Sequence, residues 1–256
     1  MSAYLTRSRR GAIFLACAAV LSFGMTGCSG NDADSAQLTR STTVSVDGAT
    51  IEASITAPAT NAHPKALVLV LGSGSEAFVN ETVRQLVDAE YATVTFDSSA
   101  ELTSAQTAIA FNQIADNRGT RLPQALVAFE STGPLAWECL ALDSARIASA
   151  LLVSSALPAG DFPFENLRET SIRATFAEGG AVYASSYERA HIPMRDIPTP
   201  HDFLIYGDVK DDYFDRESAE FDESTWEATL ASMTEWFDIW NAGGDGKSGG
   251  HNHGDG

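Results

Sequence analysis

The sequence is short of cysteine, histidine and positive charge. Its 256 residues include 3 Cys and 5 His, and 16 basic residues stand against 34 acidic ones, a formal net charge of −18. This shortage of positive charge excludes a surface that binds nucleic acid or anionic headgroups through phosphate contacts. An acidic surface suits solubility, and the specific alternative is a cationic or metal-bearing partner.

Long apolar runs are also missing from the amino-terminal region. Residues 11–23 read GAIFLACAAVLSF, too short to span a bilayer comfortably, and they follow Arg7, Arg9 and Arg10. A charged start and a short apolar stretch predict an export signal over residues 1–27. The sequence Met25-Thr26-Gly27-Cys28 resembles a bacterial lipobox. That resemblance implies cleavage before Cys28 and attachment of fatty acyl chains such as palmitate to it.

A polar stretch over residues 28–41 follows and predicts a flexible tether. Acyl chains would hold the protein stably on the extracytoplasmic face of the cell membrane. The signal takes 3 arginines with it, leaving 13 basic residues and a formal charge of −21. Only Cys139 then remains beside the acylated cysteine, so we expect no disulfide and a small buried hydrophobic residue there.

Between residues 42 and 241, short apolar runs alternate with amphipathic segments. A hairpin is indicated around Asp47-Gly48. Uninterrupted apolar strands are typical of a parallel sheet buried on both faces. The expected strands are at 66–71, 92–99, 125–129, 147–158, 171–180 and 201–208. The expected helices are at 76–91, 104–117 and 224–240, with another that follows a sharp turn at residues 130–134. The order predicts an α/β domain with a doubly wound, mostly parallel sheet, helices on both faces and an amino-terminal β-hairpin.

Residues 242–256 are rich in glycine and predict a disordered tail. Within it, His251 and His253 form a His-x-His pair that could bind Zn²⁺ or Cu²⁺ loosely. Two imidazoles define no geometry, and a plain soluble tail is the competing interpretation. We expect no cofactor.

Three segments carry a family resemblance. VLVLGSGS ends a buried strand, AFESTGPLA joins a strand to a helix through a tight turn, and residues 201–237 lead from a last strand through an aromatic pair to a helix. In this order they resemble the α/β-hydrolase superfamily, and within it the dienelactone hydrolase-like branch. The resemblance covers residues 42–240. It implies an oxyanion loop at Gly72 and Ser73, and a nucleophile, a histidine and an acid as the catalytic triad.

The turn after the third parallel strand admits two alignments with the family's G-x-S-x-G pattern. Ser131 as nucleophile puts the bulky Phe129 at the first glycine and keeps Gly133 as the second. Glu130 at the nucleophile position instead puts Ala128 and Thr132 at the two glycines, which is sterically easier. The second alignment is preferred, and the first stays open.

The other two triad positions also depart from the pattern. The aligned histidine position holds Asp211, and the sequence has no His between His201 and His251. The aligned acid position falls near Gly180, with Glu178 close by. The candidate catalytic residues are therefore Ser131, Glu130, Glu178 and Asp211. With Asp208 and Asp212, the carboxylates form an acidic group at the former active site that could bind a cation; solvated loop residues are the alternative.

The preferred interpretation is a non-catalytic lipoprotein that serves as a binding or accessory subunit of an envelope or membrane protein complex, with a respiratory assembly as one candidate. The alternative is a diverged serine esterase or lactone hydrolase that uses Ser131. A third class is an extracytoplasmic ligand or metal binder using the former pocket. A base within reach of Ser131 discriminates the first two, because a serine hydroxyl without one is a weak nucleophile.

Overall fold

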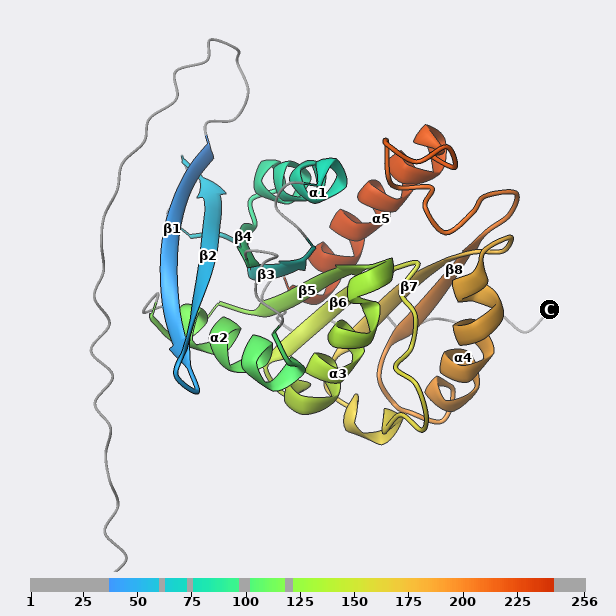
Figure 1. Ribbon diagram of the computed structural model, residues 1–256, viewed down its shortest axis with the longest axis horizontal. Coiled ribbons are helices and arrows are strands. Elements are labelled where there is room, and N and C mark those ends of the chain that lie inside the picture. Colours follow the sequence, from blue (N-terminus) through green and yellow to red (C-terminus); the bar gives the residue numbers. More distant parts are fainter. Residues whose placement is uncertain (1–36, 60–62, 73–75, 97–101, 118–121, 242–256) are drawn as a thin grey trace, which may run out of the picture.

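The computed structural model describes residues 37–59, 63–72, 76–96, 102–117 and 122–241 (Figure 1). Several expectations concern residues outside these ranges: the signal at 1–27, Cys28, Ser73, His251, His253 and the tail. The described part forms a layered α/β domain, with helices on both sides of a single sheet. None of the described helices is long and apolar enough to cross a membrane.

The sheet has eight strands in the order β1-β2-β4-β3-β5-β6-β7-β8. Its strands are β1 (Gln37–Val46), β2 (Ala49–Pro58), β3 (Leu67–Leu71), β4 (Ala92–Phe96), β5 (Gln124–Phe129), β6 (Ile147–Val153), β7 (Ser171–Ala177) and β8 (His201–Tyr206). Strands β3 to β8 all run parallel to one another. Strand β2 is antiparallel to both of its neighbours, β1 and β4. The expected mostly parallel sheet and hairpin are confirmed.

The hairpin turns at Asp47 and Gly48, whose φ angles are 50° and 83°. Two successive residues with positive φ match the right-handed twist of the strands that they join. Aspartate and glycine tolerate that backbone, which is why the pair was a reliable signal in the sequence. Strand β1 begins at Gln37, so residues 37–41, expected in the tether, are part of the sheet.

Two apolar clusters pack against the two faces of the sheet. Helices α1 (Ala77–Asp88) and α5 (Glu223–Asn241) cover one face, and α2 (Ser104–Asn117), α3 (Gly133–Asp143) and α4 (Glu188–Met194) cover the other. Trp226 and Trp137 anchor the two clusters and are almost fully buried. Burial on both faces explains why the central strands are continuously apolar rather than alternating.

The expected alternation of strands and helices implies a helix between β7 and β8, but the sequence shows no clear bounds for it. A π-helical turn, Tyr183–Tyr187, leads directly into α4. Its sequence AVYASSYERAHIPM holds a proline and two tyrosines, and its small buried face gives little helical periodicity. The helix is stabilised by packing of Ala190 and Met194 against the sheet, because the local helix propensity of this segment is low.

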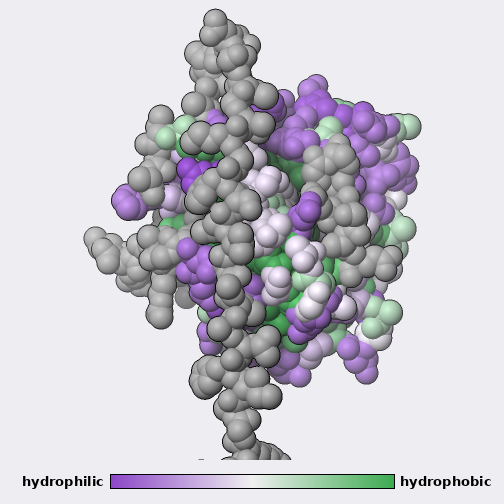
Figure 2. Space-filling view, turned by 60° about the vertical axis from the view of Figure 1, so that its left-hand side comes forward, coloured by the Kyte–Doolittle hydropathy of each residue, from purple (hydrophilic) through white to green (hydrophobic). Residues whose placement is uncertain are grey.

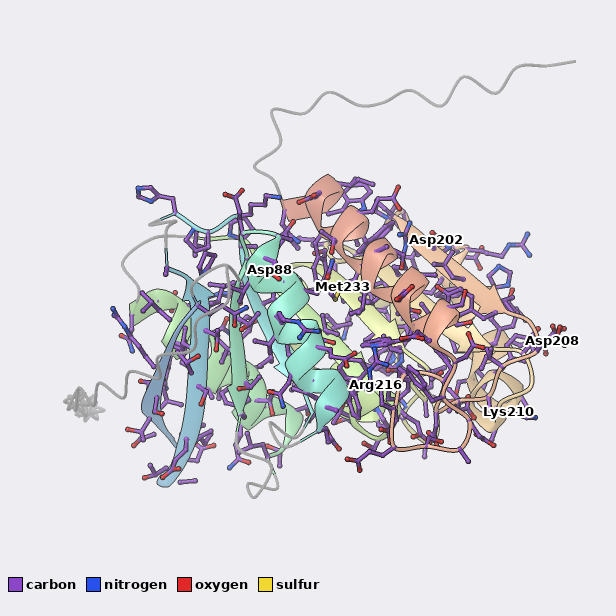
Figure 3. All side chains as sticks on the ribbon, turned by 90° about the horizontal axis from the view of Figure 1, so that it is seen from above. Asp88, Asp202, Asp208, Lys210, Arg216 and Met233 are labelled. Carbon is purple, nitrogen blue, oxygen red and sulfur yellow. The ribbon has the colours of Figure 1, made fainter. Side chains whose placement is uncertain are left out.

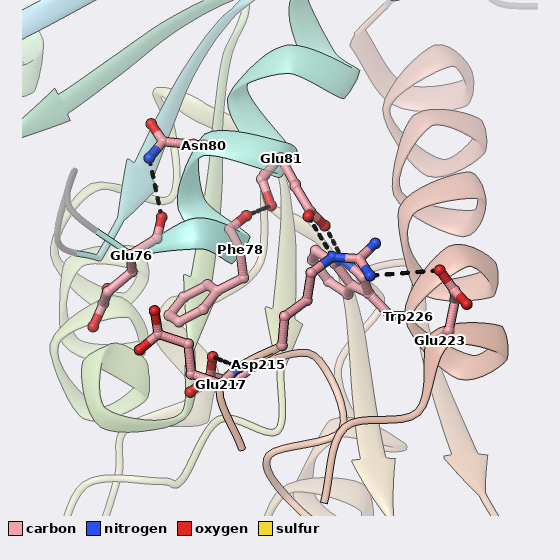
Figure 4. Close-up of polar contacts among 10 residues, drawn as sticks. Glu76, Phe78, Asn80, Glu81, Asp215, Glu217, Glu223 and Trp226 are labelled. Carbon is pink, nitrogen blue, oxygen red and sulfur yellow. Dashed lines mark hydrogen bonds and ion pairs between the residues drawn. The ribbon is translucent and has the colours of Figure 1, made fainter. Parts of the chain in front are cut away.

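The connection from β8 to α5 and the start of α5 are hydrogen-bonded to α1, which covers the same face of the sheet as α5 (Figure 4). Arg216 Nε donates to Glu81 Oε1 at 2.5 Å, and Trp226 Nε1 donates to Glu81 Oε2 at 2.6 Å. Arg216 also reaches Glu223 at 3.4 Å. Burial raises the pKa of the Glu81 carboxyl, but the hydrogen bonds from Trp226 and Arg216 outweigh it and hold that pKa below 4.5.

Candidate functional site

The candidate residues gather where the parallel strands end. Glu130 follows β5, Gly180 lies just past β7, and Asp211 and Asp212 lie in the connection after β8. Neighbouring parallel strands deliver their carboxyl ends to one edge of a sheet, which is where ligands bind in open α/β folds. The sheet therefore brings together the positions aligned with nucleophile, acid and histidine.

The turn after β5 lacks the strained backbone that presents a nucleophile in hydrolases. A short 3₁₀ turn, Glu130–Thr132, joins the strand to α3. Among the described residues, positive φ occurs outside glycine at Asp47, Glu90, Ser154 and Asp208, and so at neither Glu130 nor Ser131. Both of these residues are exposed, and Glu130 is the first after the strand.

Hydrogen bonds of the Thr132 side chain hold the turn in this unstrained conformation. Its hydroxyl accepts from the Phe129 amide at 3.1 Å and lies 2.8 Å from the Phe129 carbonyl and 3.2 Å from the Leu71 carbonyl. The next residue, Gly133, packs so closely that a Cβ on it would meet Ser155 Cβ at 2.7 Å. Thr132 and Gly133 thus fix the turn against β3 and against the chain after β6.

The carboxyls near Glu130 act on one another. Partial burial raises the pKa of Glu130, and the negative charge of Asp212, a hydrogen bond with the Asp212 side chain and the charge of Asp211 raise it further. The two neighbouring aspartates therefore disfavour a negative charge on Glu130.

Asp211 occupies the space that a triad acid would need. Its Oδ2 accepts a hydrogen bond from the Val182 amide at 3.1 Å, at the start of the helical segment before α4. A Cβ on Gly180 would lie 2.7 Å from Asp211 Oδ2 and closer still to Cγ and Oδ1. The aligned histidine position therefore holds a carboxylate that leaves room only for glycine at the aligned acid position.

Two of the expected carboxylates lie at the margin of this cluster. Glu178 is exposed, and its backbone amide continues the sheet by bonding the Tyr206 carbonyl at 2.9 Å. Asp208 is exposed with a φ of 59° and points outward beyond the end of β8 (Figure 3). In the described part of the chain, no group of three or more His, Cys, Asp or Glu side chains is arranged to hold a metal ion.

The described histidines lie away from Ser131. His201 begins β8, and Asp211 comes after its end, so about 16 Å of strand separates that imidazole from the carboxyl edge at ~3.3 Å per residue. His191 stacks on Tyr187 beside the same strand, and its ring contacts Phe203. His63 precedes β3 at the opposite edge from Glu130. No imidazole of the described ranges thus serves Ser131 as a base.

Ser154 is a feature that the sequence did not reveal. It follows β6 with a φ of 44° and is fully buried, and its hydroxyl has no hydrogen-bond partner among the described residues. Val153 pairs with Phe129, so Ser154 follows in the sheet beside Glu130. Its amide bonds the Thr175 carbonyl at 3.0 Å. The run VSSALP after an apolar strand carries no signal of this conformation.

The architecture matches solved hydrolase structures. A putative dienelactone hydrolase from Klebsiella pneumoniae subsp. pneumoniae MGH 78578 superposes with a TM-score of 0.69 at 13% identity, over 80% of this chain and 100% of that one. This chain has an α/β-hydrolase fold of the dienelactone hydrolase type. The Anabaena variabilis ATCC 29413 dienelactone hydrolase gives a TM-score of 0.57 at 16% identity, over 80% and 99% of the two chains.

A cold-adapted esterase from an Arctic intertidal metagenomic library gives a TM-score of 0.59 at 15% identity, over 83% of this chain and 97% of that one. No protein-family model and no curated protein matches the sequence. Identities this low establish the α/β-hydrolase fold and leave activity to be argued from the site.

Proposed function

We propose that this protein is a non-catalytic binding or accessory protein of the cell envelope, built on a dienelactone hydrolase-like scaffold. One observation carries the proposal. The Asp211 carboxylate, at the position of the triad histidine, lies against Gly180, at the position of the triad acid. A carboxylate there repels the negative charge of a second acid, and it cannot serve as the imidazole that accepts and returns a serine proton.

The turn after β5 supports the same conclusion. Its backbone is relaxed, Thr132 ties it down, and Glu130 shares a hydrogen bond with Asp212. The hydrogen bonds of Thr132 hold the turn in this conformation, and neither Glu130 nor Ser131 has the strained backbone of a nucleophile. The loops at the carboxyl edge of the sheet would then bind a partner instead of catalysing a reaction.

The envelope part of the proposal rests on the lipobox-like residues up to Cys28 and on the tether expected after them. Mass spectrometry of the protein extracted from membranes tests it directly. We expect a mature amino terminus at Cys28 carrying acyl chains, and loss of membrane association in Cys28→Ser. An unmodified chain that still begins at Met1 would contradict this part.

The catalytic part is tested with p-nitrophenyl esters of short acids and with lactones, using the full chain. We expect hydrolysis at the buffer rate for the wild type, Ser131→Ala and Glu130→Ala, with Ser185→Ala as an exposed-serine control on another element. Folding of each variant is checked by circular dichroism. Turnover that Ser131→Ala abolishes and Ser185→Ala leaves intact would refute the non-catalytic proposal.

The second candidate is a serine esterase or lactone hydrolase that uses Ser131. It is favoured by the fold, because the printed descriptions of the similar structures are of dienelactone hydrolases and esterases. Ser131 is exposed, as a nucleophile must be. This candidate requires a base from outside the described ranges, so replacing both His251 and His253 with alanine would abolish its activity.

A further inference from the structure

The described part of the chain begins at the outer edge of the sheet. Gln37 is the first residue of β1, and among the described strands β1 pairs with β2 alone. Eight residues separate Gln37 from Cys28, the expected site of acylation. Nine Cα–Cα steps of at most ~3.5 Å join the two residues, so they can be no more than about 30 Å apart. An anchor at Cys28 therefore keeps the start of β1 close to the bilayer.

The other edge of the sheet lies at the limit of this reach. Strand β8 is seven strand spacings away from β1, which amounts to about 34 Å at ~4.8 Å per spacing. Figure 1 shows β1 and β2 at the left end of the domain, and β8 and α4 at the right end. An orientation with β8 against the bilayer would thus require the tether to be fully stretched, at a large cost in conformational entropy.

The end of the domain that the tether joins carries little charge for so acidic a protein. Residues 37–59 and 102–117, which include β1, β2 and α2, contain one basic and three acidic residues. One of these acids, Asp116, is paired with Arg146 at 2.6 Å. Residues 201–223, which form β8 and the connection after it, contain two basic and nine acidic residues. The two ends of the sheet therefore differ strongly in charge.

Strand β1 and helix α2 form one continuous surface, which we call the hairpin end together with β2. Gln113 on α2 donates to the Ser45 carbonyl on β1 at 3.5 Å, and buried apolar residues of the two elements belong to one cluster. Thr43 on β1 is exposed, and Ile109 on α2 is 41% exposed. Figure 2 brings this side of the molecule forward, where pale residues of near-neutral hydropathy lie among purple hydrophilic ones.

We propose that the hairpin end faces the lipid bilayer, with β8 and the connection after it directed away from the membrane. The proposal rests on the envelope part of the proposed function, because acyl chains at Cys28 supply the attachment. Anionic lipids give a bilayer a negative surface potential, which repels acidic side chains within a Debye length of about 10 Å. The hairpin end brings few such side chains to the surface, so the tether and the charge distribution favour the same orientation.

Quenching by lipids that carry a nitroxide on the headgroup measures this orientation. The mature acylated protein is reconstituted in vesicles of phosphatidylcholine and phosphatidylglycerol, with a fluorophore on Thr43→Cys, Ile109→Cys or Ile205→Cys. Ile205 on β8 is the matched control for Ile109, because both are 41% exposed, and the native Cys139 is buried. We expect about twofold or more stronger quenching at the hairpin end than at β8, because most of the ~34 Å width of the sheet separates the labels.

Equal quenching of the three labels, or stronger quenching at β8, would overturn the orientation. The same preparation separates this failure from a failure of the proposed function. A wild-type protein that does not float with the vesicles and carries no acyl chain by mass spectrometry would refute the envelope part, and the orientation with it. A protein that floats while Cys28→Ser does not, but whose labels are quenched equally, would refute the orientation alone.

Added negative charge tests the electrostatic part. Ser41→Glu with Thr43→Glu adds two exposed acids to β1, and Ala184→Glu with Ala219→Glu adds two exposed acids away from the hairpin end. The first pair should lower quenching of the Ile109→Cys label about twofold or more, and the second pair should leave it unchanged; about 1 M salt should remove the difference by screening. Equal effects of the two pairs, or an effect that salt does not reduce, would overturn the electrostatic part.

Discussion

The carboxylate of Asp211 lies where the side chain of residue 180 would begin. A Cβ on Gly180 would be 2.7 Å from Asp211 Oδ2 and nearer still to Asp211 Cγ and Oδ1. The family resemblance aligned both residues with triad positions, and in the structure the residue tolerated at one position depends on the residue at the other.

This dependence can be measured by a double-mutant cycle. Gly180→Ala should lower the free energy of unfolding by about 1–3 kcal/mol, because the added methyl overlaps the Asp211 carboxylate. In an Asp211→Ala background the same change should cost much less. Urea unfolding of the four proteins gives the coupling. Gly207→Ala is the control, because its Cβ would meet only Glu178 Oε2 at 3.6 Å. Simple additivity of the two changes would contradict the overlap.

The raised pKa of Glu130 predicts a pH-dependent penalty. The folded protein binds this proton more tightly than the unfolded chain, so ionisation costs stability once the pH exceeds the folded pKa, and the cost vanishes below the ordinary value of 4.5. Glu130→Gln should therefore stabilise at pH 7, by less than about 1 kcal/mol because the residue is exposed, and should have no benefit near pH 4. Thermal melts of the variant and of Glu138→Gln across this range test the sign.

Glu81 should show the opposite pH dependence. Its pKa is lowered by Trp226 and Arg216, so its contribution is present above pH 4.5 and is lost as the pH falls through the folded pKa. Glu81→Leu leaves the Trp226 indole N–H unpaired and should cost about 1–3 kcal/mol at pH 7. Glu81→Gln keeps an acceptor and should cost less. Chemical unfolding at pH 7 and pH 4 tests both, with Glu227→Gln on α5 as an exposed control. A pH-independent difference between wild type and Glu81→Gln would argue against the lowered pKa.

Thr132 should matter for its hydroxyl and not for its volume. Thr132→Val leaves the Phe129 amide without its acceptor and should cost about 1–2 kcal/mol. Thr132→Ser keeps the oxygen and should retain most of that stability. Hydrogen exchange at the Phe129 amide reports the bond directly. Equal protection of this amide in the valine and serine variants would show that the hydroxyl does not hold the turn.

Most of the fold could be predicted from the sequence because its signals are local. Apolar runs mark the buried strands. Asp47 and Gly48 mark the hairpin, because both residues tolerate the positive φ angles that its turn adopts. The bounds of the helical segment at residues 181–194 were missed, because its helix depends on packing of Ala190 and Met194 against strands that are distant in the sequence. The start of β1 was missed for a similar reason: its polar residues pair with β2 through the backbone.

The site could be predicted only as a list of aligned positions. The sequence located Glu130, Gly180 and Asp211, but a sequence does not tell which of them touch. These contacts follow from the path of two irregular loops. Asp211 accepts a hydrogen bond from the Val182 amide, and Glu130 interacts with Asp212. Glu178 and Asp208 lie at the margin of this cluster. Ser154 could not be foreseen, because a buried unpaired hydroxyl has no sequence signature.

The two ends of the described domain lie on the same side of the sheet. Gln37 pairs with Pro58, beyond the start of β4, and Asn241 bonds Ser149 near the start of β6 at 2.7 Å. Both ends are therefore at the amino-terminal ends of the parallel strands, whereas Glu130 and Asp211 are at the carboxyl ends. At ~3.3 Å per residue, the strands separate the two edges by about 20 Å. A label or support joined at either end leaves the carboxyl edge clear. The protein can therefore be immobilised by its termini while the acidic residues at that edge stay accessible.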